Sequence, residues 1–232
     1  MRIIEKAIAA TDSVFPPGRA IFRRVRNIAQ TLHLWSPPVD KIFCGIYRNN
    51  SWADPESISG RGSTLAYTVV IRRVLPALLE SLEASSLLDA PCGDFNWMRQ
   101  VDLGGLKYIG GDVVPELIAR NRELYGDARR DFLVLDITKD QLPEVDVILC
   151  RDCLIHLSYK HIHAAIANFK KSNSRYLLTT THPALRGNSN IPTGAWRSVN
   201  LQLPPFNFPE PVRLITEHEG TGKCLGLWKL KT

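Results

Sequence analysis

The sequence predicts an α/β fold in which a mostly parallel sheet of seven strands carries helices on both faces. Two observations predict it. From residue 86 to residue 181, short apolar segments alternate with helical periods, which is typical of a parallel sheet whose strands are connected by helices. The last two apolar segments are joined by EHEGTGK, which is too short for a helical crossover, so we expect them to pair antiparallel.

The elements follow in order along the chain. Strands are expected at residues 86–90, 107–112, 131–136, 146–151, 175–181, 212–216 and 225–230. Helices are expected between the parallel strands, including residues 115–125 and 159–171. An earlier helix is predicted through Ile71, Leu75 and Leu78, which recur at helical spacing, with Ser63 or Thr64 as its cap.

Composition and charge limit the class of protein. The 232 residues are 44% hydrophobic and 22% charged, which suits one decorated domain with a sizeable core and excludes disordered and fibrous classes. The net charge is +6, of which +4 lies in residues 1–35. Because the remaining chain is close to neutral, we expect no nucleic acid partner.

The N-terminal 40 residues are predicted to form a basic helical extension, and residues 41–232 the main domain. Ile21, Val25, Ile28 and Leu32 recur at helical spacing within residues 19–35. Two interpretations stay open: this helix packs its apolar stripe on the domain, or it attaches peripherally to the inner face of an anionic membrane. We expect a cytoplasmic protein, since neither a signal peptide nor an apolar run of about 18 residues is found.

Three acidic residues close successive strands of the predicted sheet. Asp89, Asp112 and Asp136 are 23 and 24 residues apart, the length of one strand, one helix and their turns. Because parallel strands end at one edge, we expect the three carboxylates to line the same rim, where ligands of open α/β sheets bind.

The loop DAPCGD after the first strand indicates the kind of ligand. It lacks the G-x-G-x-x-G pattern that lets a diphosphate approach bare backbone. Gly93 is its one glycine, and Asp94 stands where the next helix should begin. That acid would suit the helix dipole but repel a diphosphate. A ligand without phosphates that carries positive charge fits better.

At this point a family resemblance becomes specific. LLDAPCGDFNWM resembles motif I of the class I S-adenosylmethionine-dependent methyltransferases in its DxPCG variant, and the resemblance extends through YIGGDVV, FLVLDIT and ILCRDCLIHLS to cover about residues 85–232. It implies a Rossmann-like fold and S-adenosyl-L-methionine as cofactor, with Asp112 at the ribose hydroxyls and Asp136 at the adenine. The cofactor-binding residues that it implies are Asp89, Ala90, Pro91, Gly93, Asp112, Val113, Asp136, Ile137 and Arg151.

The same string, with RNNSW before it, is similar to small bacterial methyltransferases that decorate saccharides. This implies an O-methyltransferase acting on a hydroxyl of a cell-surface or secreted glycan, lipid-linked forms such as a deoxysugar of a lipo-oligosaccharide included. Three alternatives stay open. They are methylation of a small molecule or an amine nitrogen, methylation of RNA, and a non-catalytic binding module that kept the fold.

Asp152 and His156 are the candidate catalytic residues. A sugar hydroxyl needs a base within reach of its proton, and these two residues are four apart, so in a helical turn the carboxylate would orient the imidazole. Alternatively, His156 packs under the cofactor's adenosine, and Asp152 is the base or binds a substrate hydroxyl. We expect no metal, because neither paired acids nor a second cysteine pair accompanies Cys150 and Cys153.

The substrate side is expected from two segments rich in polar and aromatic residues. One is the long loop after residue 181, and the other surrounds RNNSW and SGRGS, which we expect to close over the site. Amides, indoles and guanidinium groups hydrogen-bond hydroxyls and stack on sugars; alternatively, the loop amides only brace the loop itself. The candidates are Arg48, Asn50, Trp52, His182, Asn190, Trp196 and Asn200.

Overall fold

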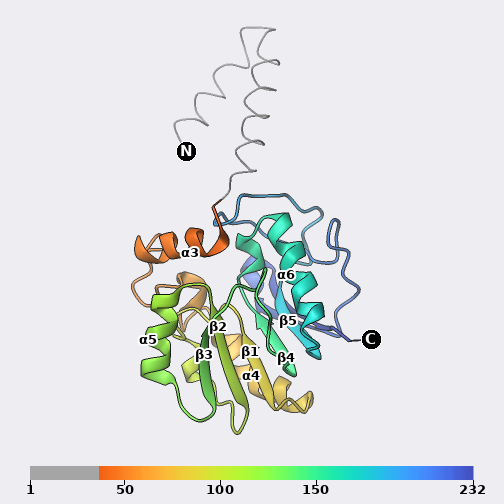
Figure 1. Ribbon diagram of the computed structural model, residues 1–232. Coiled ribbons are helices and arrows are strands. Elements are labelled where there is room, and N and C mark those ends of the chain that lie inside the picture. Colours follow the sequence, from red (N-terminus) through yellow and green to blue (C-terminus); the bar gives the residue numbers. More distant parts are fainter. Residues whose placement is uncertain (1–36, 232) are drawn as a thin grey trace, which may run out of the picture. The chain divides into compact units, whose positions relative to one another are not determined.

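The computed structural model describes residues 37–231 (Figure 1), and the helix predicted at residues 19–35 lies outside them. The strands are β1 (Ser86–Asp89), β2 (Lys107–Asp112), β3 (Arg130–Val134), β4 (Val147–Cys150), β5 (Tyr176–Thr181), β6 (Arg213–His218) and β7 (Lys223–Lys229). They form one sheet in the order β3-β2-β1-β4-β5-β7-β6. The first five run parallel, and β7 pairs antiparallel with both β5 and β6. The predicted fold class is confirmed.

Helices cover both faces of this sheet. The α-helices are α3 (Val39–Arg48), α4 (Val69–Ser81), α5 (Pro115–Tyr125) and α6 (Tyr159–Lys171), and the short 3-10 helices are η2 (Arg61–Ser63), η3 (Met98–Gln100), η4 (Leu154–His156) and η5 (Glu219–Thr221). The predicted bounds of β2, α5 and α6 agree with those observed. Within residues 37–231, no helix combines the length and apolar character needed to cross a membrane.

Alternate residues of each strand feed two separate cores. Leu87 belongs to the cluster that contains Leu75 of α4 and Ile118 of α5. Its neighbour Leu88 belongs to the opposite cluster with Phe169 of α6. Since successive side chains of a strand point to opposite faces, one apolar run can fill both layers. The sheet is therefore held rigid from both sides, and its edge is a stable platform for a site.

The segment before α4 differs from its prediction. Helix α4 begins at Val69 with Thr68 at its N-cap, so the predicted cap at Ser63 or Thr64 is wrong. The Thr64 hydroxyl donates to the Arg61 carbonyl oxygen at 2.9 Å and accepts from the Tyr67 amide at 3.3 Å. A threonine hydroxyl can accept from a backbone amide in a turn as well as at a helix N-terminus. Thr64 does so in the turn that precedes α4.

The segment around RNNSW, which we expected to close over the site, begins at the end of a helix. Helix α3 starts at Val39, before the boundary expected at residue 40, and packs Cys44 against Val114 and Leu117. Its Arg48 donates to Glu116 of α5 at 2.9 Å. The division into an extension and a main domain stays a prediction.

No α-helix begins at Asp94; within the described residues only η3 stands between β1 and β2. The Asp94 carboxylate instead accepts from the Ser57 hydroxyl at 2.8 Å and the Ile58 amide at 3.0 Å. These two hydrogen bonds, rather than a helix dipole, stabilise the negative charge of Asp94. Asp94 thus fastens the segment before η2 to the loop after β1.

The α4 contact with the sheet predicts a stability difference. Leu75 is fully buried, while Val69 on the same helix is 52% exposed. Leu75→Ala should lower the free energy of unfolding by about 2 to 5 kcal/mol, because it leaves a cavity in a close-packed core. Val69→Ala should change it by less than about 0.5 kcal/mol. Urea denaturation of both variants checks this, and equal losses would contradict the packing.

Candidate active site

A cavity of about 540 Å³ lies at the carboxyl ends of the parallel strands. Strand β1 pairs with β2 on one side and with β4 on the other, so the winding of the sheet reverses between β1 and β4. Ligands of open α/β sheets bind at such a reversal. The wall opposite the strands comes from α3, from residues 52–63 and from the loop after β5. This cavity is the candidate active site.

The three acids of the predicted rim all line the cavity. Asp89 ends β1, Asp112 ends β2, and Asp136 lies two residues beyond the end of β3. Each of the three is at least nine-tenths buried. Buried carboxylates need hydrogen-bond donors or cations, and each acid has a different set.

Asp112 ties the loop after β1 to the end of β2. Its carboxylate accepts from the Gly93 amide at 3.2 Å and the Val114 amide at 3.0 Å. Burial raises the pKa of Asp112 to about 6, and these backbone donors oppose that shift. Gly93 has φ +55°, and a Cβ there would collide with the Ser59 hydroxyl oxygen. Only glycine fits this turn, which brings bare backbone to the cavity.

Asp89 is the most deeply placed of the three acids. Burial raises its pKa to about 7, while the hydrogen bond from Tyr108 and the charge of Arg151 oppose the rise. The Tyr108 hydroxyl donates to Asp89 at 2.9 Å. Asp89 is therefore a carboxyl group that exchanges its proton near neutral pH.

Asp136 and its neighbours Ile137 and Thr138 line the cavity beyond the end of β3. Asp136 Oδ1 accepts from the amide and hydroxyl of Thr138 at 2.9 Å and 2.6 Å, and Oδ2 lies 3.4 Å from Lys139 Nζ. Apolar walls are supplied by Val39, Phe43, Val113 and Ile137. An acid facing apolar walls suits a flat, nitrogen-bearing ring that donates hydrogen bonds.

Of the residues expected at the cofactor, Pro91, Gly93, Val113, Ile137 and Arg151 line the cavity with the three acids. Ala90 is fully buried and does not line it. The Ala90 amide donates to the Leu149 carbonyl oxygen at 2.9 Å, which joins the ends of β1 and β4 beneath the site.

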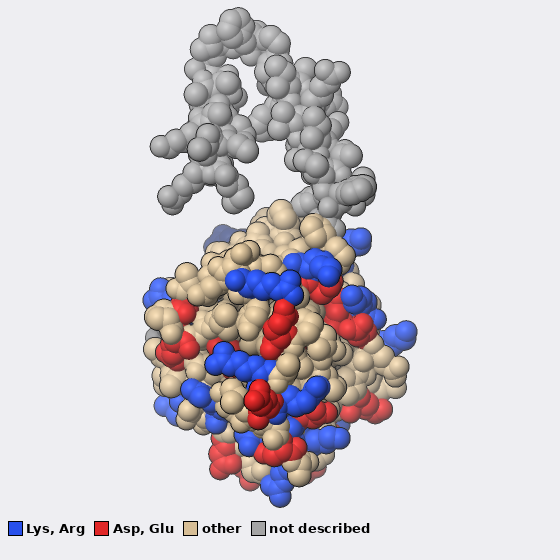
Figure 2. All heavy atoms as spheres, turned by 60° about the vertical axis from the view of Figure 1, so that its left-hand side comes forward, with Lys and Arg blue, Asp and Glu red and all other residues tan. Residues whose placement is uncertain are grey.

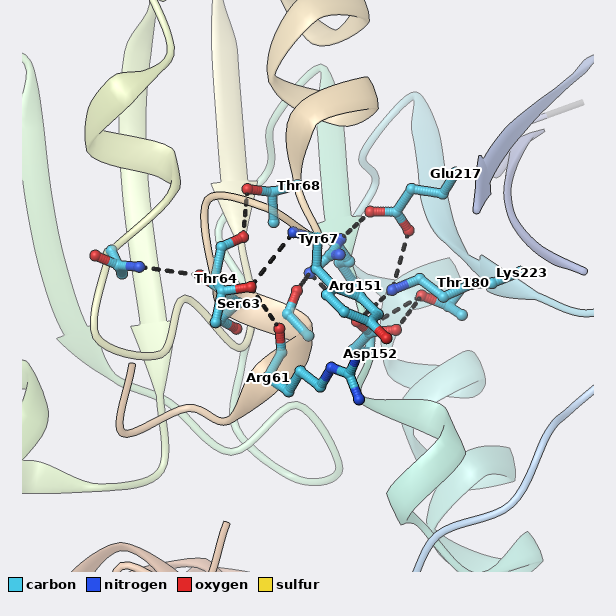
Figure 3. Close-up of polar contacts among 12 residues, drawn as sticks. Arg61, Ser63, Thr64, Tyr67, Thr68, Arg151, Asp152, Thr180, Glu217 and Lys223 are labelled. Atoms are coloured by element: carbon cyan, nitrogen blue, oxygen red, sulfur yellow. Dashed lines mark hydrogen bonds and ion pairs between the residues drawn. The ribbon is translucent and has the colours of Figure 1, made fainter. Parts of the chain in front are cut away.

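Asp152 lines the cavity as an ion-paired carboxylate (Figure 3). Burial alone would raise its pKa, but Arg151 and Lys223 outweigh burial and hold the pKa below its ordinary value. Lys223 Nζ lies 2.6 Å from Asp152 Oδ2. A carboxylate stabilised in this way is a weak base but a strong hydrogen-bond acceptor.

His156 lines the same cavity with one ring nitrogen fixed. Its Nδ1 lies 2.9 Å from the Ala195 carbonyl oxygen, and since a carbonyl only accepts, Nδ1 carries the proton. Burial lowers the pKa of His156, so the ring is neutral at pH 7 and Nε2 is a proton acceptor. The expectation that Asp152 orients the imidazole is not met, because the Ala195 carbonyl does so.

The residues expected at the substrate divide into two groups. Trp52, Trp196 and His182 line the cavity, with the two tryptophans 37% and 63% exposed at its mouth. The Trp52 ring lies 5.5 Å from that of His156 between centroids. The residues that do not line the cavity are Arg48, Asn50, Asn190 and Asn200.

Two of these amides brace the loop after β5. The Asn190 side chain accepts from the Tyr159 amide at 2.7 Å. Asn200 donates to the carbonyl oxygens of Pro183 and Leu185, each at 3.2 Å. These contacts match the alternative in which the polar loop is held by its own amides, and they position Trp196 and Ala195 at the site.

Sequence reasoning missed the contribution of the C-terminal hairpin. His218, Thr221 and Lys223 line the cavity. The signal was present in the predicted antiparallel pairing, because a strand antiparallel to β5 must begin where β5 ends. The register indeed places Cys224 opposite Thr181. Among the described side chains, no three His, Cys, Asp or Glu are grouped to hold a metal ion.

Comparison with known proteins gives a fold relationship. No protein-family model matches the sequence, and no curated protein does. Human N-acetylserotonin methyltransferase, solved with SAM, has TM-score 0.60 and 15% identity over 84% of this chain and 61% of that one. Magnesium protoporphyrin IX methyltransferase from Synechocystis PCC 6803, solved with SAM, has TM-score 0.56 and 14% identity over 84% and 97%.

The N-methyltransferase NodS from Bradyrhizobium japonicum WM9, solved with S-adenosyl-l-homocysteine, has TM-score 0.56 and 16% identity over 79% of this chain and 97% of that one. The chain therefore has the Rossmann-like fold of the S-adenosylmethionine-dependent methyltransferases. It spans 61% of the length of the human protein, and at these identities the likeness concerns the fold.

The buried Asp89 predicts a pH-dependent stability change. Its folded pKa of about 7 exceeds its value in the unfolded chain, so the folded state keeps a proton that the unfolded state has lost. The contribution of Asp89 to stability should therefore fall as the pH rises from about 4 to 7. Asp89→Asn removes this effect and should unfold at higher urea concentration than the wild type at pH 8, with little difference near pH 4.

The matched control is Glu123→Gln on the exposed surface of α5, which should leave the pH dependence of unfolding unchanged. An Asp89→Asn protein whose stability differs from wild type by the same amount at pH 8 and pH 4 would show that folding does not raise the pKa of Asp89.

Proposed function

We propose that this protein is an S-adenosyl-L-methionine-dependent O-methyltransferase that acts on a hydroxyl of a saccharide or glycoconjugate. The observation that carries the proposal is His156. Its proton-bearing Nδ1 is fixed by the Ala195 carbonyl oxygen at 2.9 Å, which leaves an unprotonated Nε2 in a cavity that also holds the cofactor residues. A hydroxyl acceptor needs such a base.

The residues present fit this cofactor. A Cβ at Gly93 would collide with Ser59, so the turn needs glycine, and the Gly93 backbone lines the cavity where the amino-acid part of the cofactor would lie. Asp112 offers carboxylate oxygens for ribose hydroxyls, and Asp136 with Ile137 and Val113 offers an acid and apolar walls for adenine. The carboxylates suit a ligand that carries a sulfonium charge and no phosphate.

The chemistry divides between cofactor and protein. When bound, S-adenosyl-L-methionine supplies an activated methyl group. His156 Nε2 accepts the proton of the acceptor hydroxyl, and the Ala195 carbonyl keeps the ring in the required tautomer. Asp152 accepts a hydrogen bond from a second donor of the acceptor, which fixes its orientation for an in-line reaction.

Two exposed tryptophans support a saccharide as acceptor. Trp52 and Trp196 stand at the cavity mouth, and an indole face packs well on the C–H face of a sugar ring, which is amphipathic. A vicinal diol of a pyranose would supply both the hydroxyl for His156 and the donor for Asp152. This combination favours a sugar over an acceptor that has one isolated hydroxyl.

An amine acceptor is the second candidate, because the ionised Asp152 would also bind an ammonium or amino group. RNA is a weaker candidate. Figure 2 shows Lys and Arg interspersed with Asp and Glu over the face that carries α3 and α5, without a continuous basic stripe. Pairs such as Arg48 with Glu116 and Arg130 with Asp127 neutralise one another, whereas RNA binding needs unpaired positive charge along a groove.

Cofactor binding provides the first test. Asp112→Asn, which keeps the shape of the side chain, should weaken the affinity for S-adenosyl-L-methionine at least about ten-fold in calorimetry, since a charge-assisted hydrogen bond is lost. Asp131→Asn is the control on the neighbouring strand, where the side chain is 58% exposed. Undetectable binding by the wild type would refute the methyltransferase proposal.

Acceptor choice provides the second test. The wild type should transfer methyl groups to members of a panel of methyl glycosides, detected by mass spectrometry, and more slowly or not at all to matched amino sugars. His156→Gln should lower kcat by about 100-fold or more, because it removes the base, while His163→Gln on exposed α6 should not. Transfer to the amine alone, with little loss in His156→Gln, would favour the second candidate.

A further inference from the structure

Asp152 belongs to a compact, largely buried group of charged side chains together with Arg151, Glu217 and Lys223 (Figure 3). Asp152 Oδ2 is 2.6 Å from Lys223 Nζ and 3.2 Å from Arg151 Nη1. Glu217 completes the group, with Oε1 2.5 Å from Arg151 Nε and Oε2 3.2 Å from Lys223 Nζ. Two cations thus face two carboxylates, so the group is balanced.

The hairpin of β6 and β7 contributes half of this group. The Glu217 side chain is fully buried, and that of Lys223 is 12% exposed. Removing a charge from water costs several kcal/mol. Lys223 and Glu217 are therefore stable here only because they contact oppositely charged groups. Glu217 bridges both cations, and without it the two positive charges would repel each other next to a single carboxylate.

Backbone and side-chain contacts restrict the position of the Asp152 carboxylate. The Asp152 backbone has φ +50°, a left-handed conformation that costs about 1 to 3 kcal/mol for a residue other than glycine and persists only where surrounding contacts impose it. The Asp152 amide donates to the Thr180 hydroxyl at 2.8 Å. A Cβ at Gly62 would lie 2.9 Å from Oδ2, so only glycine allows the chain to pass there.

The two carboxylate oxygens of Asp152 have different surroundings. Oδ2 contacts both cations, whereas Oδ1 has one long hydrogen bond, from the Thr180 hydroxyl at 3.3 Å. The side chain is 20% exposed and lines the cavity. A carboxylate oxygen can accept more than one hydrogen bond, so Oδ1 keeps the capacity to accept one from a bound molecule.

We propose that Lys223 and Glu217 are positioning residues that fix Asp152 so that Oδ1 accepts a hydrogen bond from the methyl acceptor. The inference rests on the proposed function, and it names the residues that orient the carboxylate for the second hydrogen-bond donor of the methyl acceptor. The C-terminal hairpin is then part of the acceptor site and does more than extend the sheet.

The test compares three variants of the full chain. Lys223→Met keeps the length of the side chain and removes the charge, Lys223→Arg restores the charge, and Lys229→Met is the control at an exposed position of the same strand. With the best methyl glycoside of the panel, Lys223→Met should raise the KM for the glycoside about ten-fold or more. The reason is that the Asp152 carboxylate loses the cation that orients it, and its hydrogen bond to the glycoside is weakened. Affinity for S-adenosyl-L-methionine should stay within about two-fold of wild type. Lys223→Arg should recover most of the loss, and Lys229→Met should behave as wild type.

Removing the second hydrogen-bond donor from the glycoside should have the same effect as removing the charge of Lys223. The matched deoxy glycoside, which lacks the neighbouring hydroxyl, should bind the wild type about as weakly as the full glycoside binds Lys223→Met. An unchanged acceptor KM in Lys223→Met would overturn the proposal. A Lys223→Met variant that binds the cofactor and the glycoside equally poorly and also melts at a lower temperature would overturn it as well, since Lys223 would then have only a structural role.

A second readout needs no acceptor. Carbon NMR of the Asp152 carboxyl group should show a pKa below the ordinary range in the wild type, held there by Arg151, Lys223 and the nearby His156. Lys223→Met should raise that pKa measurably, and Lys229→Met should not. If no glycoside is methylated, the proposed function fails, while the titration still decides whether Lys223 controls Asp152; an unchanged titration would overturn the positioning role.

Discussion

The site depends on one constraint, the common direction of the first five strands. Because β1 to β5 run parallel, their carboxyl ends meet at one edge, and every acidic residue that follows a strand arrives at the same place. The winding reverses between β1 and β4, so the helices that continue from those strands leave toward opposite faces and the edge between them stays open. The cavity follows from this arrangement.

Several carboxylates at one edge repel one another and lose contact with water. Each of them is stabilised by a different set of hydrogen-bond donors or cations. Asp112 accepts from two backbone amides, Asp136 from Thr138, and Asp89 from Tyr108. Asp152 is instead paired with cations. The consequence is a graded set: burial raises the pKa of Asp89 and Asp112, and ion pairing lowers that of Asp152. Groups in one cavity can therefore take different roles at the same pH.

The sequence was sufficient for the sheet and for the rim of acids, because both follow from periodicity and strand spacing. It was insufficient for contacts between distant segments. Nothing near Asp94 indicated that Ser57 and Ile58 would hold its carboxylate, and nothing near His156 indicated the carbonyl of Ala195, 39 residues away. Such contacts depend on how loops fold back over the edge, which local patterns do not encode. Lys223 is an intermediate case, since its place could have been deduced from the antiparallel pairing.

The proposed function requires that the cavity between the strand ends and the loops hold a methyl-donor nucleoside beside His156 and Asp152. A crystal structure of the protein with S-adenosylhomocysteine tests it most directly. We expect the ribose at Asp112, the adenine beside Asp136, and the sulfur on the side of the cavity that faces His156. A nucleoside bound elsewhere, or a cavity that stays empty at saturating ligand, would contradict it.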